Sequence, residues 1–141
     1  MIFTDDERDY LNSQWLGRLA TRRSDGSLQN NPVGFSLDAA TGSIDITGRA
    51  LGRTRKFANV ADNAQVALVV DDLVSRDPWT VRGVEIRGTA VALTGQETPS
   101  DYTSAEIIRI TARRVISWGL TTPGMHGRDV AAPAVASRLA R

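Results

Sequence analysis

The sequence predicts a mainly β protein, folded as a small antiparallel barrel with short helices. Three observations lead to this prediction. The chain has 141 residues, which is enough for one domain with a buried core. Its apolar residues recur in about six strand-like segments, most of which alternate apolar and polar positions between turn signals. One short helix interrupts the strands after the third, which favours a barrel over the strand–helix alternation of a Rossmann fold.

The N-terminal part is expected to form a helix followed by a three-stranded antiparallel meander. Thr4 and Glu7 have the spacing of a capping box, which predicts a helix running to about Gln14. The dipeptide Asp25-Gly26 supplies the positive φ that a hairpin turn requires. The expected strands are Leu16–Arg23, Leu28–Leu37 and Ser43–Gly48.

Beyond the meander, the sequence predicts a second short helix and three more strands. Phe57, Val60 and Ala61 have helical spacing. The segment after this helix is apolar nearly throughout, so we expect a strand that is covered on both faces and is followed by a polar loop. The expected elements are a helix Thr54–Ala61, the strands Ala64–Val70, Thr80–Leu93 and Ile107–Trp118, and a loop Asp71–Trp79.

The chain after the last predicted strand is rich in alanine, proline and glycine. This composition predicts a weakly ordered tail that begins at Gly119. We therefore expect one barrel domain over residues 1–120 and a C-terminal tail over residues 121–141.

Composition argues against several classes of site and partner. Cysteine is absent, which removes disulfides, zinc–thiolate sites and cysteine nucleophiles. The only histidine is His126, so neither a histidine-based triad nor a metal site is expected. The net charge of +1 does not favour a nucleic-acid partner. No apolar run is long enough for a membrane span and the N-terminus is acidic, so we expect a cytoplasmic protein without a membrane partner.

The densest group of cations lies where the second helix is predicted to start. It consists of Arg49, Arg53, Arg55 and Lys56, and Lys56 is the only lysine among the 17 Lys and Arg residues. A helix N-terminus carries free N–H groups and a positive dipole end, and guanidinium groups add paired donors. The cluster therefore predicts a phosphate or carboxylate site. The alternative is a solvated helix start in an arginine-rich chain.

The second strand and three aromatic residues supply further candidates. Pro32 cannot donate to a strand ladder, so its segment is expected at an edge or a bulge. Gly34 lets a planar ligand approach the backbone, although local evidence alone favours a strand with an ordinary bulge. Trp79, Tyr102 and Trp118 are candidate stacking residues, and packing in the core or an interface is the alternative.

Several stretches form a pattern that extends beyond local structure. They are Leu19-Ala20-Thr21 with Asp25-Gly26, Pro32-Val33-Gly34-Phe35, Arg53 to Val60 with Asn63, Arg82 to Gly88, and Arg109-Ile110-Thr111 with Ser117-Trp118-Gly119. In this order and spacing they resemble the pyridoxamine 5′-phosphate oxidase-like split-barrel family, over about Leu11 to Leu120. The branch that looks most similar is the actinobacterial group of reductases that use the deazaflavin coenzyme F420.

The resemblance implies a homodimer of six-stranded antiparallel split β-barrels of the FMN-binding type, with two cofactor sites at the dimer interface. The stretch Thr54 to Lys56 matches the family's cofactor-phosphate motif, and Asn31 to Phe35 matches the strand that runs along the isoalloxazine-type ring. Ile46 to Gly48 matches further ring and phosphate contacts. The candidate cofactor-binding residues are Asn31, Pro32, Val33, Gly34, Ile46, Thr47, Gly48, Arg53, Thr54, Arg55, Lys56 and Trp79.

One departure separates this chain from the FMN-binding oxidases of that family. Those proteins usually carry an arginine and a lysine on the second strand, at positions where this chain has Asn31 and Ser36. Fewer cations there weaken the hold on an FMN phosphate, so coenzyme F420 is the expected cofactor and FMN is the alternative. The cations from Arg49 to Lys56 could then follow the acidic oligoglutamate tail of F420.

The expected function is hydride transfer from reduced F420 to a small-molecule acceptor, either an activated C=C bond or a quinone-like ring, for example in secondary metabolism. The cofactor supplies this chemistry, so no catalytic side chain is expected, and Thr47 and Tyr102 are only candidate proton donors. The loop Asp71–Trp79, Tyr102 and the tail are expected to form the substrate pocket. The alternatives are an FMN-dependent oxidoreductase of the same fold and a non-catalytic protein that binds a cofactor or a haem-type ligand.

Overall fold

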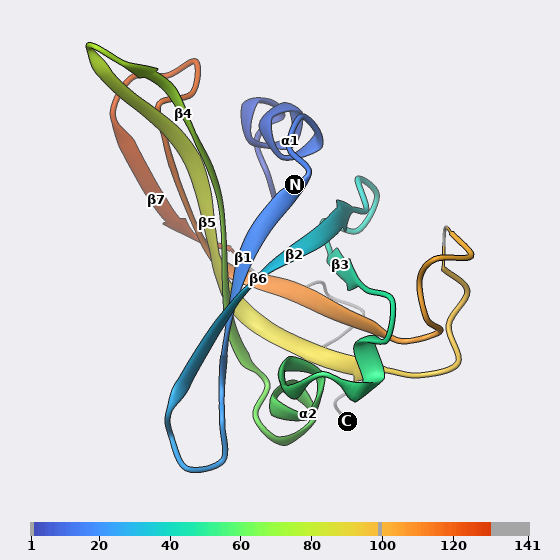
Figure 1. Cartoon of the computed structure of the whole chain (residues 1–141). Helices are drawn as coiled ribbons and strands as arrows, with labels where there is room; N and C mark the ends of the chain where they lie inside the picture. The colour runs from blue at the N-terminus through green and yellow to red at the C-terminus, as the bar shows by residue number, and fades with distance from the viewer. Residues whose placement is uncertain (1, 99, 131–141) are drawn as a thin grey trace.

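Antiparallel strands dominate the computed structural model, which describes residues 2–98 and 100–130. Within these residues, seven strands form one sheet in the order β3-β2-β1-β4-β5-β6-β7 (Figure 1). An additional pairing of β3 with β6 closes strands β1 to β6 into a ring. The expected six-stranded antiparallel barrel is therefore confirmed, and β7 is an addition to it. The strands are β1 Leu16–Arg22, β2 Leu28–Leu37, β3 Ile44–Thr47, β4 Gln65–Arg76, β5 Trp79–Leu93, β6 Ile107–Trp118 and β7 Met125–Asp129.

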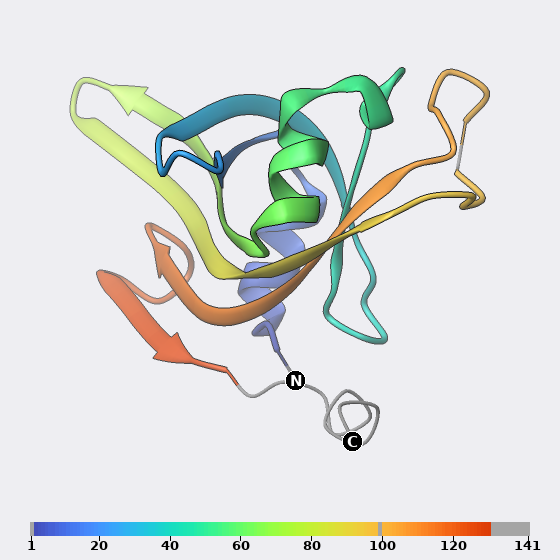
Figure 2. The same ribbon diagram turned by 90° about the horizontal axis from the view of Figure 1, so that it is seen from below.

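The helical segments are α1 Asp5–Asn12, the 3-10 turn η1 Leu51–Arg53 and α2 Arg55–Asp62. The predicted capping box of α1 is confirmed, since Glu7 N donates to Thr4 Oγ1 at 3.2 Å and Thr4 N donates to Glu7 Oε1 at 3.0 Å. The two helices lie at opposite ends of the sheet, and the view from below shows α2 with α1 behind it (Figures 1 and 2). No helix of the described residues is long and apolar enough to cross a membrane.

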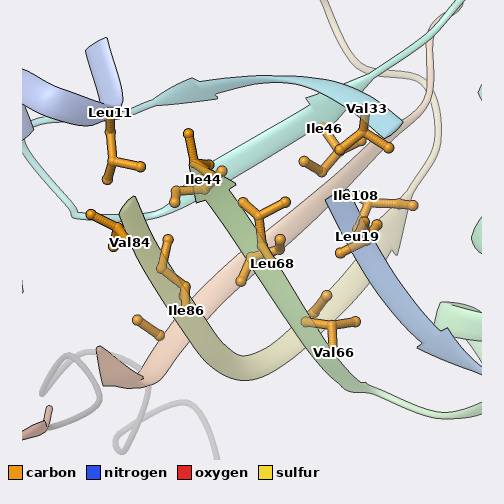
Figure 3. Packing of buried hydrophobic residues seen from close by; sticks show 14 of the residues in the cluster. Leu11, Leu19, Val33, Ile44, Ile46, Val66, Leu68, Val84, Ile86 and Ile108 are labelled. Atoms are coloured by element: carbon orange, nitrogen blue, oxygen red, sulfur yellow. The ribbon is translucent and has the colours of Figure 1, made fainter. Parts of the chain in front are cut away.

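The hydrophobic core fills the ring of strands. Leu19, Ile46, Leu68, Ile86 and Ile108 come from five different strands and are fully buried (Figure 3). Successive side chains of a strand point to opposite faces, so each strand contributes every second residue to this core. The alternation of apolar and polar residues in the sequence therefore places the ring's interior correctly.

The segment Asp71–Trp79, which was expected to be a polar loop, is instead the distal half of β4 and the turn of a long hairpin with β5. β4 continues to Arg76 and pairs with β5 along its whole length. The polar residues are accommodated by contacts across the hairpin, where Arg82 donates to Asp72 at 2.8 and 3.2 Å. The segment has the polar composition of a loop, and composition does not show that a partner for Asp72 lies ten residues further along the chain.

The expectation that β4 is covered on both faces is wrong for the single chain. Val66, Leu68 and Val70 are buried, but Ala67 and Val69 between them are only half-buried. A ring of strands has one interior, so the alternate residues face outward. The sheet consequently presents an outer face that includes apolar positions.

The expectation of a weakly ordered tail from Gly119 is wrong for the segment Met125–Asp129. This segment forms β7 and pairs with the C-terminal half of β6. Arg128 of β7 also donates to the carboxylate of Glu7, at 2.8 and 2.7 Å, and so ties the strand to α1. Residues 131–141 lie outside the described residues, and the division of the chain at residue 120 stays a prediction.

Candidate cofactor site

The cation cluster lies where the chain leaves β3 and turns into α2. Thr54 is the N-cap of α2, because its Oγ1 accepts a hydrogen bond from Phe57 N at 3.3 Å. The same hydroxyl donates to Leu51 O at 2.6 Å, which fixes η1 against the helix start. The first-turn N–H groups of α2 and the positive end of its dipole therefore face away from the helix body, as an anion site requires.

The loop before β6 supports this turn from outside. Ser104 N donates to Gly48 O at 2.8 Å, and Leu51 N donates to Ser104 Oγ at 3.0 Å. Gly52 N donates to Glu106 Oε1 at 2.9 Å, and a Cβ at position 52 would lie 2.8 Å from the same oxygen. Only glycine fits this contact without a shift of Glu106. The conformation of the turn is therefore held by these backbone contacts, and the cations are not needed to maintain it.

The cations themselves have no partner in the part of the chain that the structure describes. Arg49, Arg53 and Arg55 are exposed and Lys56 is half-buried. None of the four forms an ion pair or a side-chain hydrogen bond with residues 2–98 or 100–130. Four neighbouring cations without carboxylate partners leave a local positive charge that an anionic ligand can neutralise.

The predicted ring-binding strand is partly an open edge, as expected for Pro32. β3 pairs only with Gly34–Leu37, so the preceding residues of β2 have β1 as their sole neighbour in the described sheet. Pro32 pairs with Arg18 of β1 and lies in that one-sided stretch. Gly34 has nothing within 4 Å of the position where a Cβ would lie. A planar group could therefore approach the backbone of β2 here.

The structure brings some predicted site residues together and keeps the side chains of others in the core. Gly34 pairs directly with Thr47, and Gly48 follows at the start of the turn into η1. Asn31 is half-buried on the strand beside them. The side chains of Val33 and Ile46 are buried in the core, so these two residues can offer a ligand only their backbone.

Trp79 is separated from the rest of the predicted site. It is the first residue of β5, directly after the β4–β5 turn, and the residue is 70% exposed. β4 joins α2 at Gln65 and runs 12 residues to that turn, which is about 35 Å for an extended strand. Figure 1 shows the β4–β5 turn and α2 at opposite ends of the molecule. Within one chain, Trp79 and Lys56 do not share a site.

One functional candidate was not assigned a role from the sequence. Asn59 of α2 is 3% exposed, and its Nδ2 donates to Thr21 Oγ1 at 3.0 Å and to Gln29 Oε1 at 3.1 Å. The sequence feature that could have indicated this role is the position of Asn59, a polar amide next to the apolar Val60 on the buried side of the helix. A polar residue at such a position requires hydrogen-bond partners, which in this case come from β1 and β2.

At the opposite end of the molecule, Glu7, Tyr10 and Asp72 are paired. Burial, followed by the hydrogen bond to Asp72, raises the pKa of Tyr10, whose hydroxyl donates to Asp72 Oδ1 at 2.7 Å. The hydrogen bonds from Arg82 lower the pKa of Asp72. Burial acts to raise the pKa of Glu7, but the hydrogen bonds from Arg128 and from Thr4 N outweigh it, so this pKa is lowered. These groups hold the fold and are not available to a ligand.

Cavity size does not locate the cofactor site in the single chain. A cavity of about 590 Å³ lies between the N-terminal residues, the β2–β3 turn and the end of β7. None of the predicted cofactor residues lines it. The described residues also contain no group of three or more His, Cys, Asp or Glu side chains that could hold a metal ion. The candidate site therefore rests on the chemistry of its donors.

Comparisons with known proteins bear on the family and the reaction class. A family model described as pyridoxamine 5′-phosphate oxidase matches residues 3–135. A 5a,11a-dehydrotetracycline/5a,11a-dehydrooxytetracycline reductase of Streptomyces rimosus subsp. rimosus is 48% identical over 136 residues, which cover 94% of this chain and 96% of that protein. This relative supports oxidoreductase activity for the chain.

Solved structures share the fold at low sequence identity. A heme-binding protein from Mycobacterium smegmatis superposes with a TM-score of 0.65 at 14% identity, covering 92% of this chain and 60% of that one. A protein described as an F420 reductase superposes with a TM-score of 0.62 at 22% identity, covering 80% of this chain and 98% of that one. With the family match over most of its length, the chain belongs to the pyridoxamine 5′-phosphate oxidase family.

Proposed function

We propose that this protein is a reductase that transfers a hydride from reduced coenzyme F420 to an activated C=C bond of a polycyclic substrate. The observation that carries the proposal is the 48% identity to a dehydrotetracycline reductase over 94% of the chain. A 5a,11a-dehydro compound has a C=C bond between these two carbons, and a reductase removes it. We therefore expect a conjugated, oxygen-rich ring system as the hydride acceptor.

The donor set at the start of α2 fits a cofactor that carries a phosphodiester and an acidic tail. The N–H groups of Arg55 and Lys56 would hold the phosphodiester, and the side chains of the same two residues would neutralise its charge. The Thr54 hydroxyl already donates to Leu51 O, so its part is to cap the helix. Arg49 and Arg53 extend the positive charge along the turn, toward which an oligoglutamate tail could run. FMN is the alternative. It is the weaker fit because this chain has the uncharged Asn31 and Ser36 at the positions where FMN-binding members of the family carry cations.

The proposed reaction needs little side-chain chemistry. The bound cofactor supplies a hydride and is oxidised by two electrons, while the substrate C=C bond gains the hydride and one proton from solvent or a hydroxyl. The protein binds the two rings next to each other, and this orientation supplies much of the rate. Thr47 and Tyr102 stay the candidate proton donors, and Tyr102 is exposed on the loop that supports the α2 turn.

We also propose that the site is completed by a second copy of the chain. Leu16 and Leu28 are exposed on the outer side of β1 and β2, at opposite ends of that strand pair, and Leu16 pairs with Gly34 of the ring-binding strand. Exposed apolar side chains on these strands, of which Leu16 adjoins the site, favour association with another subunit. In a homodimer, the β4–β5 hairpin of one chain could place its Trp79 in the partner's site. Trp79 could then contact a cofactor although it lies far from Lys56 of its own chain.

A binding titration of the purified protein with oxidised F420 and, in parallel, with FMN tests the cofactor. Preference for F420, followed by consumption of reduced F420 with a dehydrotetracycline-type enone, is the expected result. Preference for FMN would overturn the F420 proposal in favour of an FMN-dependent oxidoreductase. Tight binding of either cofactor or of haem, without turnover of a panel of enones and quinones, would favour the non-catalytic alternative.

Analytical ultracentrifugation tests the dimer at micromolar concentration. The expected species is a dimer, and a monomer that still turns over substrate would overturn the role proposed for Trp79. The cytoplasmic location and the absence of a nucleic-acid partner stay predictions, and retention on duplex DNA that falls with added salt would contradict the second.

A further inference from the structure

A buried amide joins α2 to the two strands beneath it. Asn59 is 3% exposed, and both hydrogens of its amide are used, one by Thr21 Oγ1 and one by Gln29 Oε1. Thr21 is itself 2% exposed. Such a group is costly to bury unless its partners are present, so its location is not explained by packing alone.

The two acceptors form a matched pair. Thr21 of β1 and Gln29 of β2 are directly opposite each other in the strand register, so their side chains lie on the same face. One NH₂ group with two diverging hydrogens can reach both acceptors at once. The helix is thereby attached to both strands by a single residue, and its rotation about its own axis is restricted.

The same helix face carries the lysine of the candidate site. Lys56 precedes Asn59 by three residues and Val60 by four, so these side chains lie along one side of α2. Lys56 is accordingly half-buried, whereas Arg55 is exposed. On β2, Asn31 follows Gln29 by two residues and lies on the same face of the strand. The hydrogen bonds of Asn59 therefore join the element that carries Lys56 to the element that carries Asn31.

We propose that Asn59 is a positioning residue for the cofactor site. Through Thr21 and Gln29 it holds α2 in the rotation that directs Lys56 and the first-turn N–H groups toward the open edge of β2. Loss of the amide releases this rotation, although Val60 still packs the helix onto the core. This inference rests on the proposed function, since it concerns the affinity of the same site for its anionic cofactor.

The test compares cofactor affinity in four variants made in the full chain. Asn59→Ala and Thr21→Val each remove one side of the contact, and each is expected to weaken F420 binding by about tenfold, the order of one lost contact between a charged group and its ligand. Thr21→Ser keeps the acceptor oxygen and is expected to bind within about twofold of the unaltered protein. Val60→Ala destabilises the same helix without touching the amide, and it too should bind within about twofold.

A double-mutant cycle identifies the route of the effect. If Asn59 acts by directing Lys56, then Asn59→Ala should cost little further affinity once Lys56→Ala is present. Additive losses in the double variant would overturn the proposal, as would equal weakening by Asn59→Ala and Val60→Ala. If Asn59→Ala fails to fold, the comparison of Thr21→Val with Thr21→Ser decides the question in its place.

A second measurement uses the protein without cofactor. Amide hydrogen exchange at Ala58 and Asn63, whose N–H groups donate to Thr54 O and Asn59 O, should be faster in Thr21→Val than in Thr21→Ser, while exchange in β5 and β6 is unchanged. Equal exchange in the two variants would overturn the proposal. Failure of the unaltered protein to bind F420 or FMN would instead overturn the proposed function, and the exchange result would still report on the attachment of α2.

Discussion

The two ends of the barrel differ in whether their arginines form ion pairs. At the α1 end, Arg128 is bound to Glu7 and Arg82 is bound to Asp72, with distances of 2.7 to 3.2 Å. At the α2 end, Arg55 and Lys56 are without an ion pair to any described residue, as are the other cations of that turn. Both ends are rich in arginine, but the carboxylate at the α2 turn, that of Glu106, accepts from Gly52 N and forms no ion pair with these cations.

The difference separates cations that hold the fold from cations that can serve a ligand. A guanidinium that already bridges a carboxylate must break that contact to bind anything else, whereas an unpaired one binds an anion at no such cost. The comparison therefore predicts that substitutions at the α1 end change stability and that substitutions at the α2 end change binding. Four sets of variants test this division between stability and binding.

Removal of the Arg128 side chain should have the largest effect. Arg128→Ala leaves the Glu7 carboxylate, which is 2% exposed, buried without its cation. The expected loss is about 3–5 kcal/mol of unfolding free energy, measured by urea denaturation. The control is Arg114→Ala, whose partner Asp129 is on the surface, and which should cost less than about 1 kcal/mol. Equal losses in the two variants would contradict the prediction.

Removal of two cations at the other end should affect binding and leave stability unchanged. The double variant Arg55→Ala/Lys56→Ala is expected to weaken F420 binding by about a hundredfold, since each charged contact contributes about tenfold. Its unfolding free energy should change by less than about 0.5 kcal/mol because neither side chain has an ion pair in the described chain. Arg23→Ala/Arg113→Ala removes two other exposed arginines and is the control for net charge. Unchanged affinity in the double variant would exclude this turn as the cofactor site.

The dependence of stability on pH should be traceable to Glu7. The pKa of Glu7 is lowered in the folded protein from its ordinary value of 4.5. A carboxyl with a lowered pKa contributes stability above its unfolded pKa, and this contribution is lost as the pH falls through the folded pKa. Urea midpoints measured between about pH 6 and pH 3 should therefore fall more steeply in the unaltered protein than in Glu7→Gln. Parallel profiles would show that other carboxyls govern acid unfolding.

The smallest expected effect is at Tyr10. Tyr10→Phe removes the hydroxyl that donates to Asp72 at 2.7 Å but keeps the ring, over which the guanidinium of Arg82 lies at 5.1 Å. The expected loss is about 1 kcal/mol of unfolding free energy. Tyr102→Phe removes an exposed hydroxyl and should be neutral within about 0.5 kcal/mol. Cofactor binding should be unchanged in Tyr10→Phe, and a weakened affinity would contradict the separation of the two ends.

Local signals in the sequence were sufficient for much of the fold. The bounds of β2 and β6 agree with those predicted, and Thr4 and Thr54 cap their helices. Each of these features depends on residues within a few positions of one another, such as a capping pair or an alternating strand. Alternation also assigned the core face of the strands, because it directly reflects the one-sided burial of a ring.

The elements that the sequence mispredicted depend on partners far away in the chain. β7 is stabilised by pairing with β6 and by the contact of Arg128 with Glu7, which lies 121 residues earlier. The polar arm of β4 is stabilised by Arg82 across the hairpin. Composition records the small and polar residues of such segments but not the groups that satisfy them.

The sequence by itself determined the barrel, its family resemblance and the position of the cation cluster, because these follow from periodicity, capping and motif spacing within short stretches. Only the tertiary structure decided which arginines are already paired, that Trp79 lies far from Lys56 in one chain, and that Asn59 attaches α2 to two strands. These properties depend on distances between residues that the chain brings together only by folding. The sequence shows which residues are charged or can form hydrogen bonds, but only the fold determines which of them have a partner.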